Sequence, residues 1–183
     1  MSNAADPPFK RYLELARDSD VVGAMRGQVE EVVSLLGGVS EEDAARLHPP
    51  YTWTVKQVVG HLIDTERVFG YRAMRFSRGD QTELPGFDQD LFVAGGGFEK
   101  RTLRDLSSEF DAVRRGHVLM FENLPAGTWG KSGRAAGWEW TVENLARAMV
   151  GHVRHHLAIV RTRVDGGAGG YPDGEVRSLR RKQ

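Results

Sequence analysis

Residues 151–164 read GHVRHHLAIVRTRV, and two histidines in this stretch, His152 and His156, lie one helical turn apart. They continue a row of apolar residues spaced three and four apart, as in a helix that packs in a bundle. The row consists of Val142, Leu145, Met149, His152, His156 and Ile159. Buried imidazole nitrogens need a partner, because an unpaired buried polar atom costs about 1 to 3 kcal/mol. A metal ion is the leading explanation for the pair.

Length and composition fit a single domain. The chain has 183 residues, enough to bury about two-thirds of its unfolded surface. Lysine and arginine balance aspartate and glutamate at 25 each, and this neutral chain gives no indication of nucleic-acid binding. Cysteine is absent, which excludes thiolate nucleophiles and disulfides. With no signal core and no run near the roughly 18 apolar residues of a membrane span, we expect a cytoplasmic protein without membrane contact.

Apolar periodicity and capping residues predict an all-α four-helix bundle, and no run of alternating residues is long enough to indicate a sheet. The four long helices are expected after Asp20, Thr54, Thr102 and Thr141. They are expected to end near residues 37, 78, 125 and 164, and a short helical turn is expected after Ser40. A long connection, residues 79–101, separates the second helix from the third and is interpreted as a surface crossover or a lid.

The chain divides into three parts. Residues 1–19 are predicted to be a partly flexible N-terminal segment, and residues 20–164 form the bundle. Residues 165–183 are rich in glycine and then in basic residues, a composition typical of disorder.

A third histidine is the best candidate to complete a metal site with the pair. His61, in GHLIDTERVFGYR, lies beside the apolar side of the second helix. Three imidazoles with an open fourth position are the ligand set of a catalytic zinc site. Asp64, one turn after His61, and Glu66 could orient a ligand, bind the metal or accept a proton, although most helical carboxylates belong to a solvated face. Asp64 has the better spacing, and we expect it to act as a base or to anchor a ligand.

The other histidines are expected to have different roles. His155 points about 100° away from the pair and is left as a neighbour of the site. His117 and His48 are expected to be structural or exposed. No histidine follows a glutamate by three residues, which argues against a di-iron bundle, and no H-E-x-x-H, P-loop or G-x-S-x-G string is present.

Three motifs in this order resemble the DinB-like superfamily, in particular its DinB_2 or YfiT-like branch. They are a Trp-led helix with GHLIDTE at 60–66, LPGFD at 84–88 and a last helix with GHVRHH at 151–156, and the resemblance covers residues 20–164. It implies an up-down-down-up bundle, often dimeric, in which three histidines bind zinc or nickel. Carried over by position, these ligands are His61, His152 and His156, the residues already selected from the helical pattern.

The resemblance implies several reactions and does not choose between them. An open metal position can activate water, as in a hydrolase, or an exogenous low-molecular-weight thiol, as in a transferase, acting on a small-molecule substrate. The alternative is a non-catalytic bundle in which the site is structural or supports a dimer. Five aromatic residues could line a pocket, although in a bundle they are more often core; they are Trp53, Tyr71, Phe87, Phe92 and Trp138.

Overall fold

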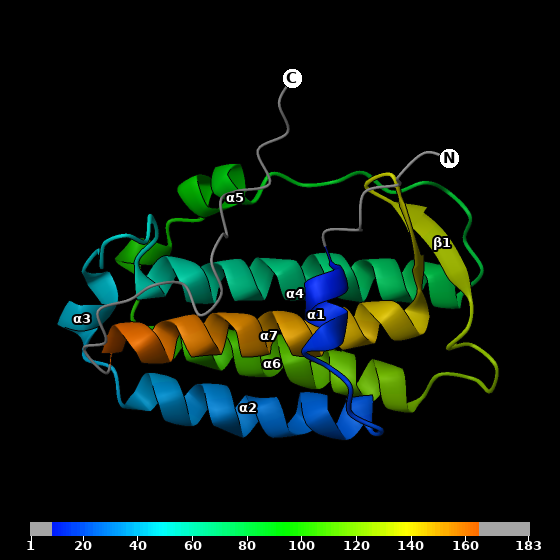
Figure 1. The fold of residues 1–183 in the computed structure, drawn as a ribbon, viewed down its shortest axis with the longest axis horizontal. Helices are drawn as coiled ribbons and strands as arrows, with labels where there is room; N and C mark the ends of the chain where they lie inside the picture. The colour runs from blue at the N-terminus through cyan, green and yellow to red at the C-terminus, as the bar shows by residue number, and fades with distance from the viewer. Residues whose placement is uncertain (1–8, 165–183) are drawn as a thin grey trace.

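The computed structural model describes residues 9–164, and their long helices form a four-helix bundle (Figure 1). The bundle consists of α2 (Val21–Gly37), α4 (Val55–Ser77), α6 (Leu103–Glu122) and α7 (Val142–Val164). The colours of Figure 1 show that α2 and α7 run in one direction and that α4 and α6 run in the other. The predicted bundle and its up-down-down-up order are therefore confirmed.

Each long helix begins at the capping residue expected from the sequence. Asp20 accepts a hydrogen bond from the Gly23 amide at 2.8 Å, and Thr54 forms a capping box with Gln57. Thr102 and Thr141 cap α6 and α7 in the same way, satisfying amides that have no partner within the helix. The third predicted helix ends at Glu122, slightly earlier than expected.

The four helices pack so that α4 and α7 lie face to face. Each of them also contacts α6 or α2: α4 packs on α6, and α7 packs on α2. The consecutive helices α2 and α4 occupy opposite corners of the bundle (Figure 1). This arrangement places the helix that carries His61 directly against the helix that carries His152 and His156.

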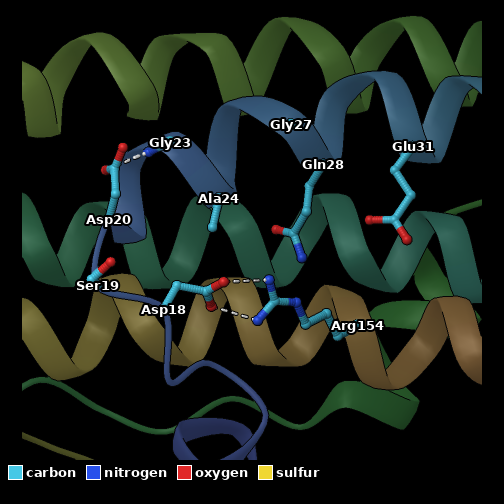
Figure 2. A pocket seen from close by; sticks show the side chains of 9 residues that line it. All are labelled: Asp18, Ser19, Asp20, Gly23, Ala24, Gly27, Gln28, Glu31 and Arg154. Carbon is cyan, nitrogen blue, oxygen red and sulfur yellow. Dashed lines mark hydrogen bonds and ion pairs between the residues drawn. The ribbon is translucent and has the colours of Figure 1, made fainter.

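The N-terminal segment contributes a short helix, α1 (Lys10–Glu14), that packs on the outer face of α7 (Figure 1). Two arginines of α7 hold the residues that follow α1. Arg147 donates to the carbonyls of Ala16 and Asp18, each at 2.9 Å, and Arg154 pairs with the Asp18 carboxylate (Figure 2). The periodicity of the sequence did not predict this element, because five residues are too few to show a helical repeat.

A β-hairpin between α6 and α7 corrects the expectation that no strands form. Strand β1 (Ser132–Ala135) pairs antiparallel with β2 (Trp138–Thr141), and Ala136 and Gly137 make the turn with φ of 54° and 83°. Two four-residue strands are too short to show the alternation that identifies a strand in sequence. The Trp140 ring is buried and stacks on Phe9 at a centroid distance of 3.6 Å, which ties the hairpin to the N-terminal segment.

The connection between α4 and α6 is a structured crossover along α4. It contains α5 (Gln89–Gly95) and the 3-10 helix η1 (Phe98–Lys100), and Leu84 bonds the hairpin through Arg134 and Ala136 at 2.9 Å each. The predicted turn after Ser40 is α3 (Glu41–Ala45). No helix within residues 9–164 is long and apolar enough to cross a membrane. The tail predicted for residues 165–183 lies outside the described residues.

Candidate metal centre

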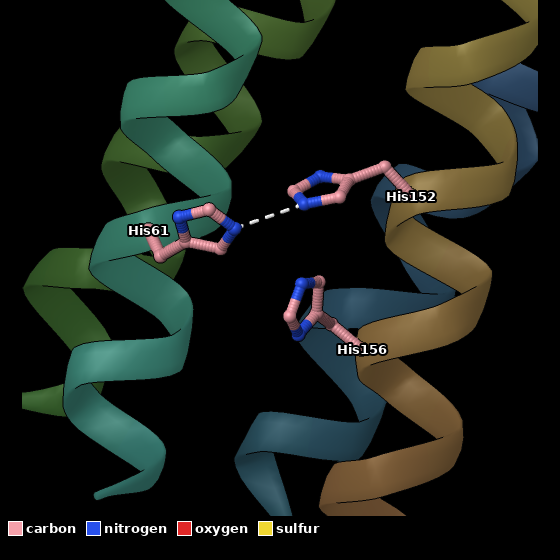
Figure 3. Close-up of side chains that lie close together, drawn as sticks. All are labelled: His61, His152 and His156. Carbon is pink, nitrogen blue, oxygen red and sulfur yellow. Dashed lines mark hydrogen bonds between the residues drawn. The ribbon is translucent and has the colours of Figure 1, made fainter. Parts of the chain in front are cut away.

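Three histidines from two helices meet in the bundle. His61 comes from α4, and His152 and His156 come from successive turns of α7 (Figure 3). Their ring centroids are 4.6 to 5.0 Å apart, and one nitrogen from each ring lies within 4.8 Å of the others. The rings turn toward a shared space between the two helices. The structure thus brings together the three residues selected from the sequence.

The closest contact joins the Nε2 atoms of His61 and His152, which are 2.9 Å apart. Two nitrogens that bind one tetrahedral zinc ion, each about 2.05 Å away, are separated by about 3.3 Å. The observed 2.9 Å lets one imidazole donate a hydrogen bond to the other. The two nitrogens are therefore within a few tenths of an ångström of the spacing of two ligands of one ion.

Burial keeps the imidazoles neutral. The exposed fractions of His61, His152 and His156 are 3%, 2% and 9%. Burial lowers the pKa of His61 to about 4, with a smaller contribution from His155. The pKa values of His152 and His156 also lie well below the ordinary value, first because of burial and then because of neighbouring histidines and arginines. The lone pairs are therefore free to bind a cation at neutral pH.

A match to a family model shows which protein family the chain belongs to. The model of the DinB superfamily matches residues 24–160, which contain all three histidines. The chain belongs to the DinB superfamily. No curated protein matches it in sequence.

A solved structure supports the DinB-like fold. YfiT from Bacillus subtilis, described as a probable metal-dependent hydrolase with an unusual four-helix bundle topology, matches with a TM-score of 0.63. The match covers 92% of this chain and 90% of YfiT at 13% sequence identity, a level at which the likeness concerns the fold.

Aromatic residues flank the histidines of this DinB-superfamily chain on two sides. Trp53, just before α4, lies 5.0 Å from the His61 ring. On the other side, Tyr12 of α1 meets the His152 ring edge-on at 5.1 Å. His155 is buried between Tyr12 and His156, at 5.8 and 4.9 Å. Sequence reasoning missed Tyr12, because no pattern in the chain connects it to α7.

The glycine before each key histidine permits a close approach. A Cβ on Gly60 would lie 2.2 Å from the Phe98 ring, and a Cβ on Gly151 would lie 1.9 Å from the Tyr12 carbonyl oxygen. Neither distance is possible for a real side chain, so only glycine allows η1 and α1 to pack where they do. This close packing explains why Val-Gly-His occurs in both α4 and α7.

Asp64 lies one turn after His61 and is half-buried. Its carboxylate faces Arg67 at 3.8 Å, and 23% of its side chain is exposed. Burial raises its pKa above the ordinary value, against the opposing charge of Arg67. A raised pKa makes a carboxylate a better proton acceptor, which agrees with the role of a base. That role of Asp64 stays a prediction.

Two predicted site residues face elsewhere. Glu66 is buried in a separate cluster, where it accepts a hydrogen bond from Arg114 at 2.9 Å and contacts His117 at 3.3 Å. Tyr71 is 47% exposed and bonds Arg75. Helical geometry explains both results, because neither residue shares the face of His61. His117 has the structural role expected for it.

A surface pocket of about 490 Å³ lies between α2 and α7, beside the N-terminal segment (Figure 2). Its lining contains none of the three histidines; it consists of Asp18, Ser19, Asp20, Gly23, Ala24, Gly27, Gln28, Glu31 and Arg154. Most of its charged groups already have partners, as in the pairs of Arg154 with Asp18 and Arg161 with Glu31. We therefore place the functional site at the histidines.

Proposed function

We propose that the protein is a metal-dependent enzyme in which His61, His152 and His156 hold a divalent transition metal, zinc or nickel. The convergence of three buried, neutral imidazoles from α4 and α7 carries this proposal. Such an ion, with one coordination position open, would lower the pKa of water or of a low-molecular-weight thiol and so supply a nucleophile near neutral pH. The reaction is then hydrolysis or thiol-dependent transfer on a small-molecule substrate.

The residues of the chain supply orientation and proton transfer. Trp53 packs against the His61 ring and Tyr12 against the His152 ring, and both contacts restrict rotation of the imidazoles. Asp64, one turn after His61 and with a carboxyl pKa raised by burial, would accept the proton that a metal-bound water or thiol gives up. Replacing Asp64 by Asn should therefore leave metal affinity unchanged and lower turnover by about a hundred-fold or more.

The first test is metal content. Wild-type protein and the variants His61→Ala, His152→Ala and His156→Ala are loaded with zinc or nickel, desalted and measured by elemental analysis. Wild type should retain one ion per chain and each variant much less. His48→Ala is the matched control, because His48 bonds the Asp43 carbonyl at 3.0 Å away from the cluster. A wild-type protein that retains no metal contradicts the proposal.

The second candidate function is a structural site. The histidines are at most 9% exposed and join α4 to α7, as a metal that only pins two helices would require. Spectra of the nickel- or cobalt-loaded protein separate the two functions. A shift on adding a small thiol or azide shows an exchangeable position and supports the enzyme, whereas an unchanged spectrum supports the structural site. Ester, amide and thiol-transfer panels then identify the reaction.

The resemblance also supports a cytoplasmic homodimer. Light scattering at several protein concentrations tests the dimer directly. A monomer at all concentrations would contradict it without affecting the metal site.

A further inference from the structure

The Nδ1 atom of His152 makes, within residues 9–164, no hydrogen bond of the kind that usually orients a metal-binding histidine. Such a histidine generally donates its second ring nitrogen to a carboxylate, a carbonyl or water, and this contact fixes the ring. Within residues 9–164, the buried Nδ1 atoms of His152 and His156 have no protein partner. The orientation of the His152 ring must therefore come from packing.

Three rings lie close to the imidazole of His152. His156 and His61 of the cluster lie at 4.6 and 4.9 Å, and Tyr12, from outside the cluster, lies at 5.1 Å with its ring plane at 78° to the imidazole. Phe69 is farther away, at 6.3 Å. An edge-on aromatic contact is directional as well as apolar, so it restricts rotation of the ring that it touches.

Tyr12 is itself held in place by the segment 9–18, which we name the N-terminal arm. The arm is attached to α7 on both sides of His152. Arg147 bonds the Ala16 and Asp18 carbonyls, and Arg154 bonds the Leu15 carbonyl at 2.7 Å and the Asp18 carboxylate. At its other end, Phe9 stacks on Trp140.

We propose that Tyr12 is a positioning residue of the metal centre, carried by the N-terminal arm and acting through the ring of His152. The inference rests on the proposed metal site and adds a residue from outside the bundle to it. Its consequence is that metal affinity and metal release depend on contacts between the arm and α7. When the N-terminal arm detaches from α7, the His152 ring becomes free to rotate and the metal site becomes exposed at the same time.

The test compares Tyr12→Ala with Tyr12→Phe, which keeps the ring. Nickel-loaded protein is mixed with excess chromophoric chelator, and the rate of metal release is followed by absorbance. Tyr12→Ala should weaken metal binding about ten- to a hundred-fold, as the loss of an orienting partner does, and release should accelerate accordingly. Tyr12→Phe should behave as wild type. Equal release from Tyr12→Ala and wild type overturns the proposal.

A second variant avoids altering the core. Arg154→Ala removes one attachment of the arm and leaves that of Arg147, and Arg161→Ala is its matched control, because Arg161 lies on the same helix but pairs with Glu31 of α2 at 2.6 Å. Arg154→Ala should speed metal release and Arg161→Ala should not, even where both lower the melting temperature equally. Identical release rates in the two variants contradict the role of the arm.

A metal-free measurement separates this inference from the proposed function. Apo-protein is treated with diethyl pyrocarbonate, and modification of His152 is quantified by peptide mass spectrometry. His152 should react severalfold faster in Tyr12→Ala and Arg154→Ala than in wild type, Tyr12→Phe and Arg161→Ala. If wild type binds no metal, the proposed function fails. If His152 reacts at one rate in all five proteins, the inference about Tyr12 fails.

Discussion

Two buried polar clusters lie in the same bundle and balance their charges differently. In one, Arg114 and Glu66 are 0% and 1% exposed by side chain, and their opposite charges meet at 2.9 Å. In the other, three neutral imidazoles face one another without an acid among them. The first cluster contains both charges and neutralises itself, whereas the second consists of neutral imidazoles whose lone pairs can bind a cation.

The two clusters also interact. The positive charge of Arg114 lowers the pKa of His152, after burial and the neighbouring histidines. Arg114 additionally donates to the Met149 carbonyl at 3.3 Å, one turn before His152. The ion pair therefore holds α4, α6 and α7 together beside the histidines. Both clusters are buried, but only the Arg114–Glu66 cluster contains opposite charges that neutralise each other. Burial of polar groups alone therefore does not identify a binding site.

Of the changes proposed, breaking the Glu66–Arg114 ion pair should lower the free energy of unfolding the most. Glu66→Leu leaves Arg114 charged and unpaired in the core, which should lower the free energy of unfolding by about 3 to 5 kcal/mol. The double variant Glu66→Leu, Arg114→Leu removes both charges and should lose less. Urea denaturation of the metal-free proteins measures both values. Equal losses in the two variants would show that the pair is not self-neutralising.

A bound metal ion should stabilise the folded protein only through the histidine cluster. At a free zinc or nickel concentration about a hundred times the Kd, wild type should gain about 2.7 kcal/mol of stability. His156→Ala should gain far less, while His48→Ala should show the full gain. Melting curves with and without metal provide the measurement, and chelation should reverse the gain. A full gain in His156→Ala would place the metal elsewhere.

The histidine cluster should also make stability depend on pH. Because burial lowers the pKa of the three histidines, the unfolded chain binds more protons than the folded one below about pH 6.5. The free energy of unfolding should therefore fall as pH drops from 6.5 toward 4, by at most about 1.4 kcal/mol per pH unit for each histidine. Metal-free His61→Leu should have a correspondingly smaller slope. An identical slope would contradict a neutral, buried His61.

Two glycine substitutions should change stability with opposite signs, and the stabilising one, Gly116→Ala, should give the smallest effect. Nothing lies within 4 Å of a Cβ at Gly116 in α6, so Gly116→Ala should stabilise the helix by about 0.5 to 1 kcal/mol. Gly151→Ala should destabilise the protein, because its Cβ meets the Tyr12 carbonyl. Thermal melts of both variants test this pair. Stabilisation by Gly151→Ala would show that α1 does not pack closely on α7.

The sequence predicted the long elements and the histidine triad because both depend on local periodicity. Thr54 and Thr141 indicate where helices begin, because they cap the first turn. The spacing of three and four residues between apolar positions places His152 and His156 on the buried face of α7. The hairpin was missed, because its four-residue strands are too short to show alternation. Trp140 belongs to β2 and stacks on Phe9 from the other end of the chain.

By itself, the sequence determined which residues share a helical face, where the long helices begin and which histidines are core residues. These features depend on neighbours three or four positions away. Only the tertiary structure decided that Glu66 belongs to Arg114 and that Tyr12 touches His152. Such contacts join elements distant in the chain, and they arise from packing and charge balance, which leave no periodic trace in a sequence.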